Sequence, residues 1–209
     1  TGVLPRKPGI PGQDHPKVLT YLDVLRDKRE VGERVAVIGA GGIGFDICEF
    51  LSHDGDESSV DINAFLIKWG IDPKNETRGG VVGIEPVVPK STRQITLLQR
   101  KTTRLGAGLG KTTGWIHRTS LKAKNIDMVA GAQYERIDDK GLYYSVNGEE
   151  CILAVDTIVI CTGQVPLRDL HDELKKNGIS SNLIGGADVA VELDAKRAIN
   201  QGSRLAASL

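Results

Sequence analysis

The chain has 209 residues, of which 40% are hydrophobic and 26% are charged. This length and composition allow one large or two small folded domains with a buried core, and they argue against intrinsic disorder. Lys and Arg total 27, as do Asp and Glu, so the formal net charge is zero and favours neither nucleic acid nor a membrane surface as a partner. We find no signal peptide and no apolar run of the ~20 residues that span a bilayer.

The cysteines and histidines show no pattern of a metal, redox or catalytic site. Cys48, Cys151 and Cys161 have no C-x-x-C spacing, and we expect each to be a buried small hydrophobic residue. Free thiols are typical of a reducing compartment, so we expect a cytoplasmic protein. The histidines lie far apart and are expected to be surface or structural groups: His15, His53, His117 and His171.

The N-terminal part predicts a loop, a helix and a strand. Residues 1–14 are punctuated by Pro and Gly, which is typical of a loop. Pro16 suits the first turn of a helix, and the apolar spacing that follows predicts that this helix runs to about Asp27. The short apolar run Arg34–Ile38 predicts a strand.

A glycine motif follows this strand directly. It consists of Gly39, Ala40, Gly41, Gly42, Ile43 and Gly44, in the pattern G-x-G-x-x-G. The first glycine permits a tight turn, the second lets the backbone approach a pyrophosphate, and the third allows close packing of helix on strand. A helix is predicted from the motif to about Leu51, with an apolar face formed by Ile43, Ile47, Phe50 and Leu51. In this context the motif predicts a Rossmann dinucleotide site rather than a glycine-rich turn without a ligand.

The type of dinucleotide is predicted from the end of the next strand. Residues 52–93 are polar and rich in Gly, Pro and Ser, and they predict an insertion with a short helix at Ile62–Trp69. The strand Gln94–Gln99 then ends in Arg100 and Lys101. An acid at this place binds the ribose of NAD, whereas arginine favours the 2′-phosphate of NADP, so the pair predicts NADPH. The insertion explains the unusually long spacing from the motif, and the alternative is a solvated basic strand end.

Two further features near the motif have alternative explanations. Asp46, expected in the first turn of the helix, could reach the nicotinamide side of the cofactor or could be an acid favoured by the helix dipole. Gly110-Lys111-Thr112 suggests a phosphate-binding P-loop, but Leu105 stands where that motif needs glycine. We therefore reject a P-loop and keep Lys111 as an additional phosphate contact.

The second half of the chain predicts an antiparallel meander and a C-terminal helical region. A helix at Thr112–Lys124 and a strand at Asn125–Val129 come first. The meander strands are Ala132–Ile137, Leu142–Val146 and Glu150–Val155, with Asn147-Gly148 as a hairpin turn. A buried strand, Thr157–Cys161, then ends at Thr162-Gly163, and we expect Gly163 to pass close to the cofactor. The remaining elements are a helix at Asp169–Lys176, a strand at Asn182–Ile184 and a helix at about Glu192–Leu205.

The motif, the meander and the Thr-Gly strand end together resemble the NAD(P)H domain of the two-dinucleotide-binding flavoprotein reductases. The C-terminal segment GGADVAVELDAKRAINQG resembles the FAD-closing motif of that superfamily. This resemblance implies that Gly186 and Asp188 contact FAD, with Asp188 at its ribityl or diphosphate portion. It also implies that the helix containing Ala195 presents its start to the flavin.

The segments VAVIGAGGIGFD, LLQRK, GLGKTTGWIHR and INQGSRLA, with the opening TGVLPRKPGIPGQDHPKVLTYLDVLRDK, narrow the match. They resemble the C-terminal part of bacterial-type NADPH-dependent 2,4-dienoyl-CoA reductases over nearly the whole chain. That family implies an N-terminal TIM barrel with FMN and a 4Fe–4S cluster, followed by FAD and NADPH domains, acting in the β-oxidation of unsaturated fatty acids. We therefore expect a fragment that binds NADPH, holds only a partial FAD site, and needs the missing N-terminal domains for catalysis.

The expected fold class is α/β, with a Rossmann-like parallel sheet and a three-stranded antiparallel meander. By resemblance, 31–163 is the NADPH-binding domain, 1–30 is an FAD-domain remnant with a linker, and 164–209 is the C-terminal part of the FAD-binding domain. One alternative is a related enoate-reductase or amine-dehydrogenase-like flavoprotein, some of which bind ADP or nothing in this domain. The other is a non-catalytic nucleotide-binding module, since fold alone does not decide function.

Overall fold

The computed structural model describes residues 2–53, 55, 58–191 and 193–209. The chain divides into two compact units. The larger unit is Gly9–Ile160, and the smaller unit joins the first eight residues to Cys161–Leu209. The larger unit thus contains the glycine motif, and the assignment of 1–30, 31–163 and 164–209 to FAD-binding and NADPH-binding parts stays a prediction.

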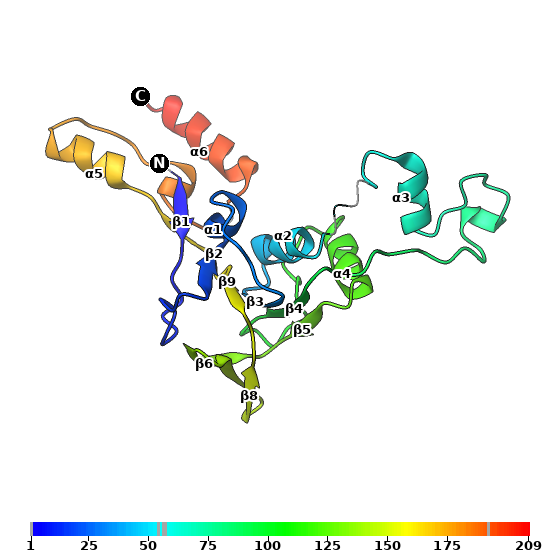
Figure 1. Ribbon diagram of the computed structural model, residues 1–209. Helices are drawn as coiled ribbons and strands as arrows, with labels where there is room; N and C mark the ends of the chain where they lie inside the picture. The colour runs from blue at the N-terminus through cyan, green and yellow to red at the C-terminus, as the bar shows by residue number, and fades with distance from the viewer. Residues whose placement is uncertain (1, 54, 56–57, 192) are drawn as a thin grey trace. The chain divides into compact units, whose positions relative to one another are not determined.

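A parallel sheet, here called the main sheet, organises the larger unit (Figure 1). Among the described residues its strand order is β2-β9-β3-β4-β5, and every neighbouring pair is parallel. The bounds are β2 Val18–Thr20, β3 Arg34–Ile38, β4 Gln94–Leu98, β5 Asp127–Val129 and β9 Thr157–Ile160. In the register of the central strands, Ile38 lies opposite both Leu98 and Ile160. The carboxyl ends of β3 and β4 therefore lie side by side.

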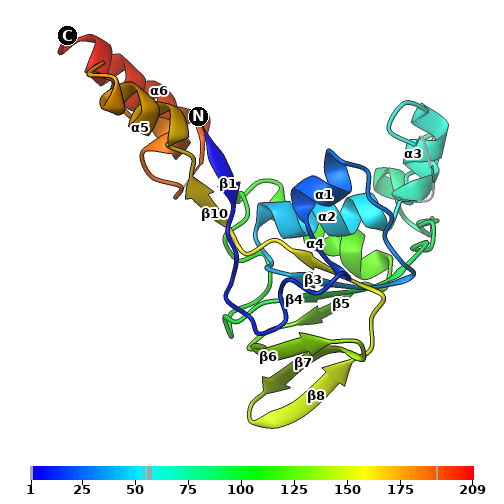
Figure 2. The same cartoon turned by 60° about the vertical axis from the view of Figure 1, so that its left-hand side comes forward.

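Helices cover one face of the main sheet and the meander covers the other, as Figure 2 shows. The helices are α1 Tyr21–Leu25, α2 Gly42–Leu51 and α4 Gly114–Ala123, and the meander strands are β6 Gln133–Asp138, β7 Gly141–Val146 and β8 Glu149–Leu153. Side chains alternate across a strand, so Ala36 and Ile38 pack with the meander residues Ile137 and Leu142. The expected fold class, an α/β fold with a parallel sheet and an antiparallel meander, is confirmed.

The helix expected from Pro16 to Asp27 is wrong in its first half. Val18–Thr20 is instead the edge strand β2, which pairs in parallel with β9. Helix α1 starts only after Thr20, whose hydroxyl accepts a hydrogen bond from the Asp23 N–H while the Asp23 carboxylate accepts one from the Thr20 N–H. This capping box fixes where the helix begins.

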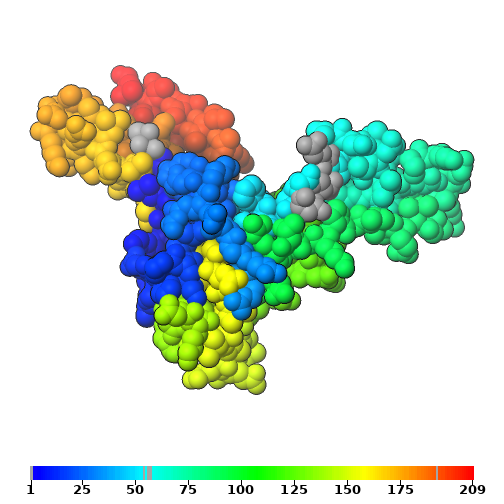
Figure 3. All heavy atoms as spheres, viewed as in Figure 1, coloured from blue at the N-terminus to red at the C-terminus, as the bar shows by residue number. Residues whose placement is uncertain are grey.

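The insertion at 52–93 contains little regular structure among its described residues. The expected short helix is confirmed as α3, Ile62–Lys68, which the Asp61 carboxylate caps at its N-terminus; a 3₁₀ turn, η1, follows at Arg78–Gly80. Large apolar side chains of this segment are exposed at Val60, Ile62, Val81, Val82 and Val87. In Figure 3 its atoms run from cyan to green.

The smaller unit is built around a short antiparallel pair. Strand β1, Val3–Pro5, pairs with β10, Gln164–Pro166. Its other elements are α5 Asp169–Lys176, the 3₁₀ turn η2 Gly185–Ala187 and α6 Ala195–Ala206. The strand expected at Asn182–Ile184 is wrong, because these residues form no strand. The last helix begins at Ala195, because the Asp194 side chain caps it. Glu192, where we expected this helix to begin, lies outside the described residues. No helix formed by the described residues is long and apolar enough to cross a membrane.

Candidate dinucleotide-binding site

The glycine motif forms the turn between β3 and α2. Gly39 has a φ of 112°, which favours glycine, and its N–H donates to the Leu98 carbonyl of the neighbouring strand at 2.8 Å. A Cβ on Gly44 would lie 1.8 Å from the Gly39 carbonyl oxygen and 3.5 Å from the Leu97 side chain. The first and last glycines of the motif are therefore required by the tight turn and by the packing of α2 on β4.

The start of α2 is open and uncapped by any side chain. Gly41 is its N-cap residue and makes no side-chain hydrogen bond to the helix. Gly41 and Gly42 are exposed, and a Cβ on either would meet no atom within 4 Å. The first N–H groups of a helix have no partner within the helix, and they attract anions. The motif thus fits the pyrophosphate of a dinucleotide, with Ala40 and Ile43 completing the turn.

Arg100 and Lys101 follow the neighbouring strand β4. Both side chains are exposed, and among the described residues neither forms an ion pair. Because β3 and β4 are adjacent and parallel, the glycine turn and the two cations follow strand ends at the same edge of the main sheet. This carboxyl edge is where open α/β sheets bind their ligands.

The helix that follows the motif corrects two expectations. Asp46 is exposed but is the fifth residue of α2, beyond the first turn, because the helix already begins at Gly42. The expected apolar face is partly wrong: Phe50 is 47% exposed, whereas Phe45 and Cys48 are fully buried. The apolar spacing in the sequence did not predict the burial of Phe45 and Cys48. These residues are buried because α2 packs against both the main sheet and α4.

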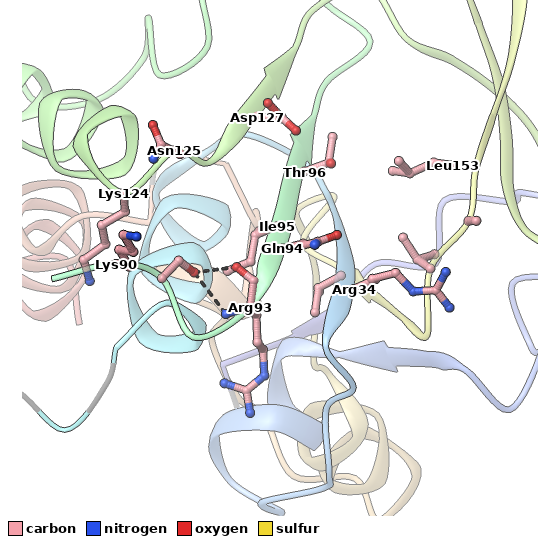
Figure 4. A pocket seen from close by; sticks show the side chains of 14 residues that line it. Arg34, Lys90, Arg93, Gln94, Ile95, Thr96, Lys124, Asn125, Asp127 and Leu153 are labelled. Atoms are coloured by element: carbon pink, nitrogen blue, oxygen red, sulfur yellow. Dashed lines mark hydrogen bonds between the residues drawn. The ribbon is translucent and has the colours of Figure 1, made fainter.

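The opposite, amino edge of the main sheet carries a hollow of about 370 Å³ at the starts of β3, β4 and β5 (Figure 4). Arg34 and Asp156 form an ion pair there, with an Nη2 to Oδ1 distance of 2.5 Å. Hydrogen bonds from Arg34 lower the pKa of Asp156 to about 2. Lys124 is buried, and its Nζ donates to the Ser52 hydroxyl at 3.2 Å. These cations serve the fold, and sequence reasoning identified none of them.

In the smaller unit, Gly163 lies beside Arg6, the residue that follows β1. The Arg6 N–H donates to the Gly163 carbonyl at 3.0 Å, and the Arg6 guanidinium donates to the Thr162 carbonyl. Gly163 is exposed with a φ of 100°. The structure therefore shows a glycine-specific turn at this strand end, and the contact of Gly163 with a cofactor stays a prediction.

The residues expected to contact FAD are brought together around η2. A Cβ on Gly186 would lie 2.8 Å from Val3, so the chain is tightly packed there. The Asp188 carboxylate accepts a hydrogen bond from the Gln201 side chain of α6 at 2.7 Å. Ala195 is the first residue of α6, whose N-terminus the Asp194 carboxylate caps. These contacts connect the GGAD segment to α6. The role of this segment and of the start of α6 in flavin binding stays a prediction.

The cysteines and histidines have structural surroundings. Cys48 and Cys161 are buried as expected, whereas Cys151 is only half-buried, because it lies on the outer meander strand β8. Each histidine has a hydrogen-bond partner: His15 with Asp139, His53 with the Gly55 N–H, His117 with Glu49, and His171 with Ser181. The described residues contain no cluster of three or more His, Cys, Asp or Glu that could hold a metal ion.

Comparison with known proteins identifies the family. The model of the family "Pyridine nucleotide-disulphide oxidoreductase" matches residues 1–194. The chain belongs to this family. The chain thus contains an NAD(P)-binding domain of the flavoprotein oxidoreductase type. The 2,4-dienoyl-CoA reductases are a finer assignment and stay a proposal.

Among curated relatives, the chain is similar to a metal reductase of Desulforamulus reducens, 22% identical over 187 residues, and a cinnamate reductase of Clostridium sporogenes, 26% identical over 188. Each match covers 90% of this chain but only 27% and 23% of those proteins, so the chain spans about a quarter of their length. A solved complex of 2-naphthoyl-CoA reductase with 2-naphthoyl-CoA superposes with a TM-score of 0.73 at 18% identity, covering 100% of this chain and 26% of the other. That likeness shows a shared fold.

Proposed function

We propose that the larger unit binds NADPH, with the pyrophosphate at the start of α2 and the 2′-phosphate at Arg100 and Lys101. The observation that carries this proposal is the position of the uncapped helix start and the two exposed cations at one edge of the main sheet. The sequence contains no Asp or Glu between Glu85 and Asp127, so no nearby acid in this stretch repels a phosphate. Lys111 lies in the same stretch and is a further candidate contact.

The second part of the proposal concerns the flavin. The smaller unit is proposed as the C-terminal part of an FAD-binding domain, with Gly186, Asp188 and the start of α6 at Ala195 as its contribution. When bound, NADPH would supply a hydride and FAD would accept it. In this proposal Asp46 lies toward the nicotinamide side of NADPH, and the remainder of the FAD site belongs to parts of the protein outside this sequence.

The third part of the proposal is the substrate of the whole protein. We propose reduction of a 2,4-dienoyl-CoA through an N-terminal barrel with FMN and a 4Fe–4S cluster, in the cytoplasm. The support is the sequence resemblance, together with relatives whose names include a cinnamate reductase and a 2-naphthoyl-CoA reductase. The alternatives are a related enoate-reductase or amine-dehydrogenase-like flavoprotein and a non-catalytic nucleotide-binding module. The Arg100–Lys101 pair favours a protein that uses NADPH.

The NADPH proposal can be tested by competition. Binding of NADPH to the 209-residue chain should be displaced by 2′,5′-ADP, which carries the 2′-phosphate, at a much lower concentration than by 5′-AMP. Equal displacement by both nucleotides would contradict the role of Arg100 and Lys101. For the substrate, the natural protein that carries this chain should oxidise NADPH when a 2,4-dienoyl-CoA is added as the electron acceptor. Oxidation of an added amine by an artificial electron acceptor, with no NADPH oxidation by the dienoyl-CoA, would favour the amine-dehydrogenase-like alternative.

A further inference from the structure

The turn that presents Arg100 and Lys101 is closed from within by a side chain. The Gln99 carboxamide nitrogen donates to the Lys101 carbonyl at 3.0 Å and to the Thr103 carbonyl at 2.5 Å. A carboxamide has two N–H donors, so each carbonyl can take one. Gln99 is half-buried, whereas the side chains of the turn itself are exposed.

The main chain around Gln99 is also fixed. Its N–H donates to the Val129 carbonyl at 2.9 Å, and its carbonyl accepts from the Ala132 N–H at 3.0 Å. The Gly131 N–H reaches the Lys101 carbonyl at 3.0 Å, so the segment after β5 holds that part of the turn as well. The Thr103 part, by contrast, is held by the Gln99 carboxamide. The side chain of Gln99 therefore determines how the turn closes.

We propose that Gln99 is a positioning residue for cofactor discrimination, which it exerts by shaping the turn that carries Arg100 and Lys101. This inference rests on the proposed binding of NADPH and extends it to a residue that does not touch the ligand. Two carbonyl oxygens of the turn face the Gln99 carboxamide, which keeps their partial negative charges away from a bound phosphate. A turn that is closed before binding also loses less conformational entropy when the phosphate arrives.

The test compares cofactor affinities of matched variants. Gln99→Met keeps the length of the side chain and removes both donors. We expect its affinity for NADPH to fall about tenfold, with that for NADH changing less than about twofold, since a net hydrogen-bond loss has this size. Gln94→Met is the control, because Gln94 is an exposed glutamine at the start of β4, whereas Gln99 follows the end of β4 (Figure 4). The control should leave both affinities unchanged.

The outcomes separate this inference from the proposed function. A wild-type chain without preference for NADPH would overturn both. A wild-type preference that Gln99→Met retains in full, or an equal loss for both cofactors, would overturn the role of Gln99 alone. Thermal unfolding shows whether each variant is folded. If Gln99→Met does not fold, Gln99→Asn keeps the carboxamide but is too short to reach both carbonyls, and it should show an intermediate loss of preference.

Discussion

The two edges of the main sheet both carry cations and use them differently. At the amino edge Arg34 pairs with Asp156, and the buried Lys124 donates to Ser52. At the carboxyl edge Arg100 and Lys101 are exposed, and within the described parts of the chain neither forms an ion pair. Surroundings, more than charge, therefore separate a cation that stabilises the fold from one that can bind a ligand.

The largest effect should follow from Gly44→Ala at the carboxyl edge. The added methyl would lie 1.8 Å from the Gly39 carbonyl oxygen, so the turn and α2 must separate. We expect the free energy of unfolding to fall by about 3 kcal/mol and NADPH binding to be lost. Gly108→Ala is the control, because its Cβ would meet no atom within 4 Å. A Gly44→Ala chain with wild-type stability in urea titration would contradict the close approach.

Exchanging one arginine at each edge tests the comparison directly. Arg100→Ala should weaken NADPH about tenfold to a hundredfold, because a charge-assisted hydrogen bond to the phosphate is removed, and should leave NADH nearly unchanged. Arg34→Ala at the amino edge should leave both affinities unchanged. Calorimetric titration measures both. Equal losses for NADPH and NADH in Arg100→Ala would rule out the 2′-phosphate assignment.

A smaller effect, on stability, is expected at Tyr134 of β6, whose hydroxyl is affected by the charge of Arg100. Burial raises the pKa of this phenol, the charge of Arg100 opposes the rise, and the buried hydroxyl has no hydrogen-bond partner among the described residues. Tyr134→Phe should therefore stabilise the fold by about 1 kcal/mol in urea titration. Tyr144→Phe is the control, because its hydroxyl contacts Cys151 and its removal should bring no gain. Destabilisation by Tyr134→Phe would show that the hydroxyl has a partner.

The smallest effect concerns the pH dependence of the amino edge. The pKa of Asp156 is lowered from 3.8 to about 2 by hydrogen bonds from Arg34, so the ionised form is favoured in the folded state. Its contribution to stability is present above about pH 4 and is lost as the pH falls toward 2. Asp156→Asn should lose this part of the acid dependence in urea titrations across that range. An unchanged acid dependence would mean that the ion pair does not contribute.

The sequence predicted the central strands well because they are buried on both faces. Arg34–Ile38 and the strand at 94–98 appear as continuous apolar runs, and tertiary packing agrees with the local pattern there. Val18–Thr20 was predicted as helix because three residues carry too little pattern. Its strand state depends on pairing with β9, which lies far away in the sequence.

The candidate site was predictable only in part. The glycine motif and the Arg100–Lys101 pair are local patterns, and the structure places both at one sheet edge. The support around them is not local: the Gln99 hydrogen bonds depend on the shape of a turn, and the Arg34–Asp156 pair joins residues from distant strands. Such contacts leave no periodic signal in a single sequence.

Calorimetric titration of the folded 209-residue chain with NADPH and, separately, with NADH tests the proposed NADPH site most directly. The arrangement of the α2 start and the two cations predicts that NADPH binds at least about tenfold more tightly, as expected for one charge-assisted phosphate contact. Equal affinities would contradict the assignment of Arg100 and Lys101. Absence of binding by either cofactor to a folded chain would contradict the assignment of Gly39–Gly44 as the pyrophosphate site.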